Sequence, residues 1–259
     1  INCTPDSFFP SSRYDSVLAA CCKAQEMAVS GAKIIDIGGQ STRPGSGFVE
    51  ANEECRRVLP VIEQLRAVSD IAISIDTMKV KVAERALDAG ADIVNDVSAL
   101  ADASMRALVA ERCVPVVLMH MRGTPKTMQR APYYYAVVEE VADELKRSID
   151  QSLAAGVEEQ QIIIDPGIGF GKRIQDNLLI IREMSSFRRL GRPILVGLSH
   201  KSFLGTVLGE RPVEDRCAAT IAGGCLALAN GADIIRVHDV DSAVDTVCLV
   251  ESVARGAIA

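Results

Sequence analysis

The sequence of 259 residues contains no tryptophan, and aromatic residues of all kinds make up only 4% of it. Its longer apolar runs, such as Val114 to Met119, fall far short of the ~20 residues that a membrane-spanning helix needs. There is no basic cluster, and 34 acidic residues against 28 basic ones argue against nucleic acid as a partner. The eight cysteines form no C-x-x-C pair, so we expect reduced thiols in a cytoplasmic protein that binds no membrane.

Short β-branched runs alternate with longer amphipathic stretches along the whole chain, which predicts βαβ units and a parallel sheet. The predicted strands are Lys33–Gly38, Ile71–Thr77, Asp92–Val97, Val114–His120, Ile162–Pro166, Pro193–Ser199 and Asp233–Asp239. The predicted helices are Asp15–Ser30, Ala51–Val68, Met78–Ala89, Asp102–Arg112, Tyr133–Ala155, Ile174–Arg189, Val213–Asn230 and Asp241–Ala254.

With Ile1 and Asn2 as the end of a truncated first strand, the pattern gives eight strands and eight helices. This is the number of a (β/α)₈ TIM barrel, and we expect residues 1–259 to form one such domain. A doubly wound open sheet shares the same alternation and is the alternative fold.

The predicted strands all end in polar residues: Asn2, Asp36, Asp76, Asn95, His120, Asp165, Ser199 with Lys201, and Arg236 with His238. Strands buried on both faces should be almost entirely apolar. The carboxyl ends of barrel strands hold the active site, so this ring predicts where the chemistry lies. Any one of these aspartates could instead be a helix cap, and His120 alone is by default structural.

Three loops extend this ring. The segments 2–8 and 38–45 combine Gly, Pro and hydroxyl residues with charge, which suits loops that close over a substrate. Asp165–Lys172 contains G-x-G-x-G, which fits neither a Walker loop nor a dinucleotide fingerprint. It favours a turn that lets the backbone approach a flat ligand.

These motifs resemble the dihydropteroate synthases, a family of pterin-binding enzymes, from one end of the chain to the other. The resemblance is carried by Asn2–Phe8, Ile35–Gly45, Ile73–Thr77, Asn95–Val97, Leu118–Gln129, Asp165–Lys172, Val196–Gly205 and Arg236–Val240. It implies a TIM-barrel transferase of folate biosynthesis, a sulfonamide target. This enzyme would condense hydroxymethyl-dihydropterin diphosphate with p-aminobenzoate, giving dihydropteroate and pyrophosphate by dissociative displacement.

The resemblance also implies site residues and a homodimer. The pterin pocket would comprise Asp76, Asn95, Met119, Asp165, Phe170, Gly197, Lys201 and Arg236. Thr42, Arg236 and His238 would bind the diphosphate, and Asn2 would bind Mg²⁺. The aminobenzoate pocket and its loops would use Phe8, Thr42, Arg43, Pro44 and Ser202, with Asp6 pairing Arg43. The catalytic set would be Lys201, Arg236, His238, Asp6 and Arg43.

The sequence departs from the family pattern at His200, where arginine is usual, and at Gln40, where glutamate is commoner. An imidazole, which is largely neutral near pH 7, replaces a guanidinium that is always charged. A phosphate or carboxylate contact made by that arginine is therefore not expected to be kept in the same form. A non-catalytic pterin-binding paralogue and a corrinoid-type pterin-dependent methyltransferase are therefore alternative functions. A barrel for phosphorylated sugars would not explain Asp76 and Asn95.

Overall fold

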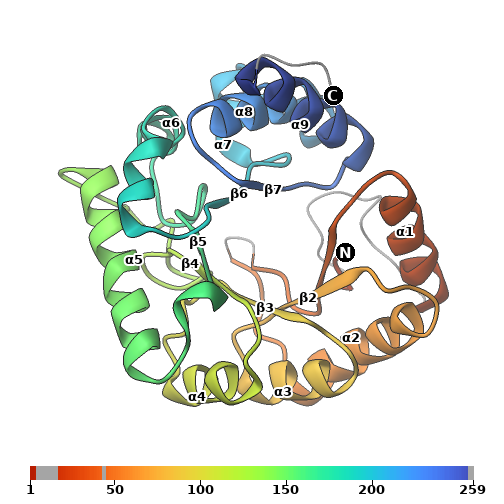
Figure 1. The fold of residues 1–259 in the computed structure, drawn as a ribbon. Helices are drawn as coiled ribbons and strands as arrows, with labels where there is room; N and C mark the ends of the chain where they lie inside the picture. The colour runs from red at the N-terminus through yellow and green to blue at the C-terminus, as the bar shows by residue number, and fades with distance from the viewer. Residues whose placement is uncertain (4–16, 43–44, 256–259) are drawn as a thin grey trace.

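A computed structural model describes residues 1–3, 17–42 and 45–255 of the chain (Figure 1). Its strands are β1 (Ile34–Gly38), β2 (Ala72–Asp76), β3 (Ile93–Asp96), β4 (Val116–Met119), β5 (Ile162–Asp165), β6 (Leu195–Gly197) and β7 (Ile234–Arg236). Strands β1 to β5 form one sheet in sequence order, and β6 pairs with β7; all pairings are parallel. An isolated bridge between Ile164 and Ile194 joins β5 to β6, and one between Asn2 and Gly38 extends the ring before β1.

This unbroken sequential order confirms the TIM barrel, because a doubly wound sheet would reverse its strand order. Where Ile1 and Asn2 are predicted to end a first strand, the described structure has an isolated parallel bridge between Asn2 and Gly38. Cys3 donates its backbone N–H to the Gly38 carbonyl at 2.8 Å, and the Gly38 N–H donates to the Ile1 carbonyl at 3.0 Å.

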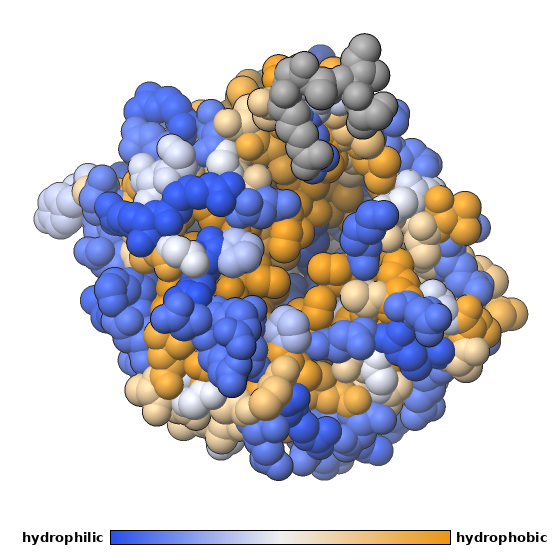
Figure 2. Space-filling model, viewed as in Figure 1, coloured by the Kyte–Doolittle hydropathy of each residue, from blue (hydrophilic) through white to orange (hydrophobic). Residues whose placement is uncertain are grey.

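Helices surround the strands in chain order, so that each crossover packs its apolar stripe onto the outside of the ring (Figure 1). They are α1 (Val17–Val29), α2 (Ala51–Arg66), α3 (Val80–Asp88), α4 (Ala103–Arg112), α5 (Val137–Ala154), α6 (Ile174–Arg182), α7 (Ser202–Val207), α8 (Cys217–Ala229) and α9 (Val240–Arg255). In the space-filling view, hydrophilic residues lie mainly along the rim and hydrophobic ones nearer the centre (Figure 2). No helix in the described ranges is long and apolar enough to cross a membrane.

Strand register determines which polar ends become neighbours. Gly38 and Asn95 lie on either side of Asp76 in the ladder. Met119 is paired with Asp165, and Gly197 with Arg236. Residues predicted on separate motifs therefore meet at one end of the barrel because parallel strands in register end together.

Two predicted helix boundaries are wrong, for identifiable reasons. The helix predicted from Tyr133 begins at Val137, because the Glu140 carboxylate accepts the backbone N–H groups of Tyr135 and Ala136 at 2.7 and 3.0 Å. The helix predicted over 174–189 ends at Arg182 and continues as a 3₁₀ turn over 184–190. There the Asn230 side chain donates to the Ile181 carbonyl at 2.9 Å.

The segment after β6 also differs from the prediction. Short helix α7 (Ser202–Val207) lies in a stretch for which no helix was expected, and the helix predicted from Val213 starts as a 3₁₀ turn before α8. Gly205 is packed so tightly that a Cβ there would lie 2.5 Å from Arg216 Nε. Tertiary packing therefore stabilises this short helix, since its length alone would not.

Candidate active site at the carboxyl ends of the strands

A guanidinium lies between two carboxylates at the centre of the site. Arg236, at the end of β7, donates from Nε to Asp36 at 2.6 Å and from Nη2 to Asp76 at 3.0 Å. Asn95 Nδ2 lies 3.3 Å from the same Asp36 oxygen. The ends of β1, β2, β3 and β7 are thus connected by one polar network that crosses the barrel mouth.

The two carboxylates differ electrostatically although they share this cation. Burial raises the pKa of Asp76 to about 7, and the negative charge of Asp36 adds to that effect while Arg236 opposes it. Burial acts to raise the pKa of Asp36 as well, but the Arg236 charge, the N-terminal ammonium and hydrogen bonds from Ser74 and Arg236 together hold that pKa below its ordinary value. Asp36 is therefore the permanent counterion, and Asp76 is the carboxylate whose charge changes near neutral pH.

A second group of residues lines the opposite side of the mouth. Lys201 donates from Nζ to the Ile168 carbonyl, and the same Nζ lies 4.8 Å from the centre of the Phe170 ring. A Cβ at Gly169, where φ is +83°, would lie 3.0 Å from Lys201 Cδ, so glycine is needed there. Burial lowers the pKa of Lys201 to about 8, with Asp165 opposing the shift.

Asp165 accepts the N–H of Gly167 at 2.7 Å, and burial raises its pKa above the ordinary value while Lys201 opposes that shift. The buried Met119 lies beside it in the ladder. An acid, a cation and two apolar side chains, Met119 and Phe170, thus come together, as expected for a pocket that holds a flat polar ring.

The diphosphate-binding residues predicted at β7 and after β1 lie at the same end of the barrel. His238 Nδ1 is 2.8 Å from Ser199 Oγ. Thr42 lines a small cavity together with Asp76, and a cluster of Gln40, Glu54 and Lys79 lines the same cavity. Ser202 is the exposed first residue of α7.

The described structure does not test every predicted residue. Asp6, Phe8, Arg43 and Pro44 lie outside the described residues. Asn2 is described and pairs with the last residue of β1. No group of three or more His, Cys, Asp or Glu side chains that could hold a metal occurs in the described ranges.

The His200 ring is buried and is not available to bind a ligand at the barrel mouth, as the guanidinium of an arginine could. Its side chain is 1% exposed, with Nδ1 2.9 Å from the Val213 carbonyl and Nε2 3.0 Å from Asp239. The backbone there has φ +54°, and the His200 N–H donates to Thr220 Oγ1 at 3.0 Å. The imidazole thus connects the segments after β6 and β7.

Three residues in this end of the barrel carry no role in the predicted site: Asp36, His120 and Lys172. Asp36 and His120 belong to the ring of polar strand ends, and Lys172 ends the glycine-rich motif after β5. His120 and Lys172 are both buried and lie 2.9 Å apart. Only its burial in the structure singles out Lys172, because lysine is almost never fully buried without partners.

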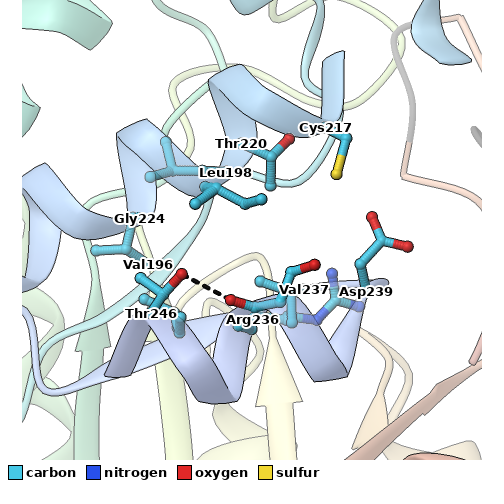
Figure 3. A pocket seen from close by; sticks show the side chains of 13 residues that line it. Val196, Leu198, Cys217, Thr220, Gly224, Arg236, Val237, Asp239 and Thr246 are labelled. Carbon is cyan, nitrogen blue, oxygen red and sulfur yellow. Dashed lines mark hydrogen bonds between the residues drawn. The ribbon is translucent and has the colours of Figure 1, made fainter. Parts of the chain in front are cut away.

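A separate cavity lies outside the strand ring, between β6 and β7 on one side and α8 and α9 on the other (Figure 3). Its lining is largely apolar, with Thr220 and Cys217 from α8 and with Asp239, which directly precedes α9. Thr246 and Ser242 also line the cavity, and the Thr246 hydroxyl donates to the Ser242 carbonyl at 2.7 Å. Of the described residues predicted for the site, Arg236 is the one that borders this cavity.

The barrel with this polar ring at its carboxyl end defines a small-molecule enzyme of the TIM-barrel class, and comparison with known proteins specifies the family. A family model described as "Pterin binding enzyme" matches residues 1–238. The dihydropteroate synthase of Synechocystis is 45% identical over 93% of this chain and 84% of its own length. That of Haemophilus influenzae is 41% identical over 95% and 89%. The chain belongs to the pterin-binding enzyme family, as its motifs predict.

Solved structures agree with the sequence relatives. The dihydropteroate synthase of Yersinia pestis in a sulfonamide complex superimposes with a TM-score of 0.95 at 38% identity, covering 98% of this chain and 92% of that one. That of Xanthomonas albilineans with 4-aminobenzoic acid gives 0.90 at 42% identity, over 98% and 90%. These values confirm the predicted fold and the resemblance to dihydropteroate synthases.

Proposed function

We propose that this chain is a transferase that condenses hydroxymethyl-dihydropterin diphosphate with p-aminobenzoate, giving dihydropteroate and pyrophosphate. The observation that carries the proposal is the meeting of Asp76, Asn95, Asp165 and Lys201 around one barrel mouth, in a chain whose curated relatives are named dihydropteroate synthases. Neither a corrinoid methyltransferase nor a phosphate-sugar barrel is favoured by an observation of this kind.

The pterin is held by the groups at the strand ends. Asp76 and Asp165 accept its amino and ring N–H groups, while Asn95 and Lys201 supply complementary hydrogen bonds. Met119 and Phe170 are the apolar walls, and Gly197 leaves room beside Arg236 and Lys201, 3.9 Å and 3.8 Å from where its Cβ would lie. A ring with a different donor pattern would leave buried groups unpaired, which gives the pocket its specificity.

The diphosphate faces Thr42, Arg236 and His238. Guanidinium and imidazole groups bind phosphate oxygens through charge-assisted hydrogen bonds. Asn2 is the proposed Mg²⁺ ligand, and a single protein oxygen suits an ion that takes most of its ligands from substrate phosphates and water. When bound, Mg²⁺ would neutralise charge on the leaving diphosphate.

The displacement breaks one bond at the pterin methylene carbon and forms another. The bond between the pterin methylene carbon and the diphosphate oxygen breaks, and pyrophosphate leaves with the electron pair. The amine nitrogen of p-aminobenzoate then forms a bond to that carbon and loses a proton. We assign the aminobenzoate pocket to Phe8, Thr42, Arg43, Pro44, Lys201 and Ser202, with Asp6 pairing Arg43.

We further propose a homodimer formed through α8 and α9. Helix α8 contains no charged residue, which is typical of a helix enclosed on all sides, yet Leu226 on it is 56% exposed. Leu249 and Val253 of α9 are exposed as well. All eight cysteines are free, which agrees with a reducing compartment such as the cytoplasm.

The test is product formation from the two substrates with Mg²⁺, followed as pyrophosphate and as dihydropteroate. Dihydropteroate that appears only with p-aminobenzoate supports the proposal. Tight binding of the pterin diphosphate without product would indicate the non-catalytic paralogue. Failure to bind the pterin at all would overturn the pocket assignment.

A further inference from the structure

The loop between β5 and α6, residues 165–173, lies directly on the segment that follows β4. A Cβ at Gly167 would lie 1.8 Å from the His120 carbonyl oxygen, and one at Gly171 would lie 2.5 Å from the Arg122 carbonyl oxygen. Both glycines have positive φ values, +68° and +61°. No side chain can intervene, so the two segments are in contact through their backbones.

Lys172 lies buried between these segments and is 3% exposed. Its ammonium group has three N–H bonds, and Nζ has three close acceptors: His120 Nδ1 at 2.9 Å, the Gly167 carbonyl at 2.9 Å and the Phe170 carbonyl at 3.0 Å. Burying an ammonium is costly unless every proton is bonded, and here the geometry meets that requirement.

The partners beyond His120 fix its tautomer. His120 Nε2 lies 3.0 Å from Glu144 on α5, and a carboxylate accepts, so Nε2 carries the proton and Nδ1 is free to accept from Lys172. Arg122 donates to Glu144 and lies 4.0 Å above the Tyr134 ring. Burial lowers the pKa of His120 to about 4, with the Lys172 charge adding to the effect, which agrees with a neutral ring.

Side chains donate to five consecutive carbonyl groups of the loop, those of residues 167–171. Besides the two bound by Lys172, Gly169 accepts from Gln129 at 2.8 Å, Gly171 accepts from Tyr134 at 2.9 Å, and Ile168 accepts from Lys201. Lys201 therefore binds the Ile168 carbonyl, which lies between the carbonyls of Gly167 and Phe170 that Lys172 binds. The positions of Lys201 and of the adjacent Phe170 ring depend on these hydrogen bonds to the loop carbonyls.

We propose that Lys172, held by His120 and Glu144, is a positioning residue for pterin recognition: it fixes the loop after β5 and thereby places Asp165, Phe170 and Lys201. Lys172 does not touch the substrate. The inference rests on the proposed function, because it assigns these three residues to the pterin pocket.

The test compares Lys172→Met with Lys146→Met. Methionine keeps the length of the side chain and removes its three donors, and Lys146 is an exposed lysine on α5. For Lys172→Met we expect KM for the pterin diphosphate, and its dissociation constant measured without p-aminobenzoate, to rise about tenfold or more. KM for p-aminobenzoate should rise less than KM for the pterin diphosphate, because Lys201 is the one residue that the two assigned pockets share among those that Lys172 places. Lys146→Met should behave as the wild type.

Glu144→Gln provides a second test in case Lys172→Met does not fold. The charged or titratable groups facing Lys172 are Asp165, Lys201, Glu144, Arg122 and His120. Burial lowers the pKa of Lys172 to about 7, and Glu144 is one of the charges that oppose this shift. Removing that charge should lower the pKa further. The alkaline fall of kcat/KM for the pterin should therefore move to lower pH.

Outcomes separate this inference from the proposed function. Wild-type protein that binds no pterin diphosphate would overturn the function. If the wild type binds it, and folded Lys172→Met binds it equally well, then the positioning role is wrong. An unmoved alkaline limb in Glu144→Gln would also contradict it, as would equal rises in both KM values for Lys172→Met.

Discussion

Arg236 Nε lies 2.6 Å from an oxygen of Asp36, although 200 positions separate the two residues in the sequence. The same guanidinium also reaches Asp76 on the next strand. One planar side chain therefore joins three strand ends, which an ammonium on a flexible stem cannot do with the same geometry.

Arg236→Lys should lower kcat/KM by about 10- to 100-fold, because a buried carboxylate would lose its charged donor at about 1–3 kcal/mol. Steady-state kinetics on both substrates would measure this. Arg182→Lys, at an exposed surface pair, is the matched control and should have no effect. Full activity of Arg236→Lys would show that the bridging geometry is dispensable.

The pH dependence of kcat/KM should be bell-shaped with a narrow maximum near neutrality. Activity rises as Asp76 ionises, since its pKa of about 7 lies above the ordinary value and only the carboxylate accepts the pterin N–H groups. Activity falls as Lys172 and Lys201 lose protons, because burial lowers their pKa values to about 7 and about 8. The profile of kcat/KM reports groups of the free enzyme.

Asp36→Asn should move the acid limb of that profile to lower pH. The charge of Asp36 raises the pKa of Asp76, so its removal lets Asp76 ionise earlier. Kinetics between about pH 5 and pH 8 would follow the change, which accompanies any loss in rate. An acid limb that stays in place would mean that another group controls it.

Lys79→Met should destabilise the protein by about 3 kcal/mol, because it leaves a buried carboxylate without its cation. Glu54 is 1% exposed and is bonded by Lys79 and by Thr77, at 2.7 Å for the latter. Lys79 also donates to Gln40 at 2.6 Å. Urea unfolding would measure the loss, and Lys81→Met, at an exposed position of α3, is the control. Equal midpoints for the two variants would contradict the prediction.

His200→Arg should lower stability by about 1–3 kcal/mol and should not raise activity. The site is enclosed and its ring nitrogens already bond Val213 and Asp239, so a longer side chain overpacks it. Urea unfolding and initial rates would be measured together. A faster enzyme of unchanged stability would show that this position still faces the diphosphate.

Leu249→Glu should convert the proposed dimer to monomer, because an unpaired carboxylate in an apolar interface is costly. Sedimentation velocity would measure the mass in solution. Leu18→Glu on α1 is a matched control, since both leucines are 63% exposed. A wild-type monomer would overturn the proposed dimer. A dimer that is insensitive to Leu249→Glu but sensitive to Leu18→Glu would place the interface elsewhere.

The sequence by itself determined the barrel, the family and the end of the barrel that holds the site. The barrel and its polar end follow from local patterns: apolar runs at strand spacing, amphipathic helices between them, and a polar residue at the end of each strand. The family follows from the resemblance of the motifs at those ends. Helix boundaries at Tyr133 and Arg189 were less predictable, because they depend on side chains such as Glu140 and Asn230 that take over backbone groups.

Only the tertiary structure decided which polar groups become partners. Asp36 as the counterion of Arg236, Lys172 as the link between two loops, and His200 as a buried connection all join segments from different strands. Such pairings depend on strand register and on the burial of each group, which set both the distances and the cost of leaving a charge unpaired. The periodicity of the sequence specifies neither the strand register nor the burial of each group.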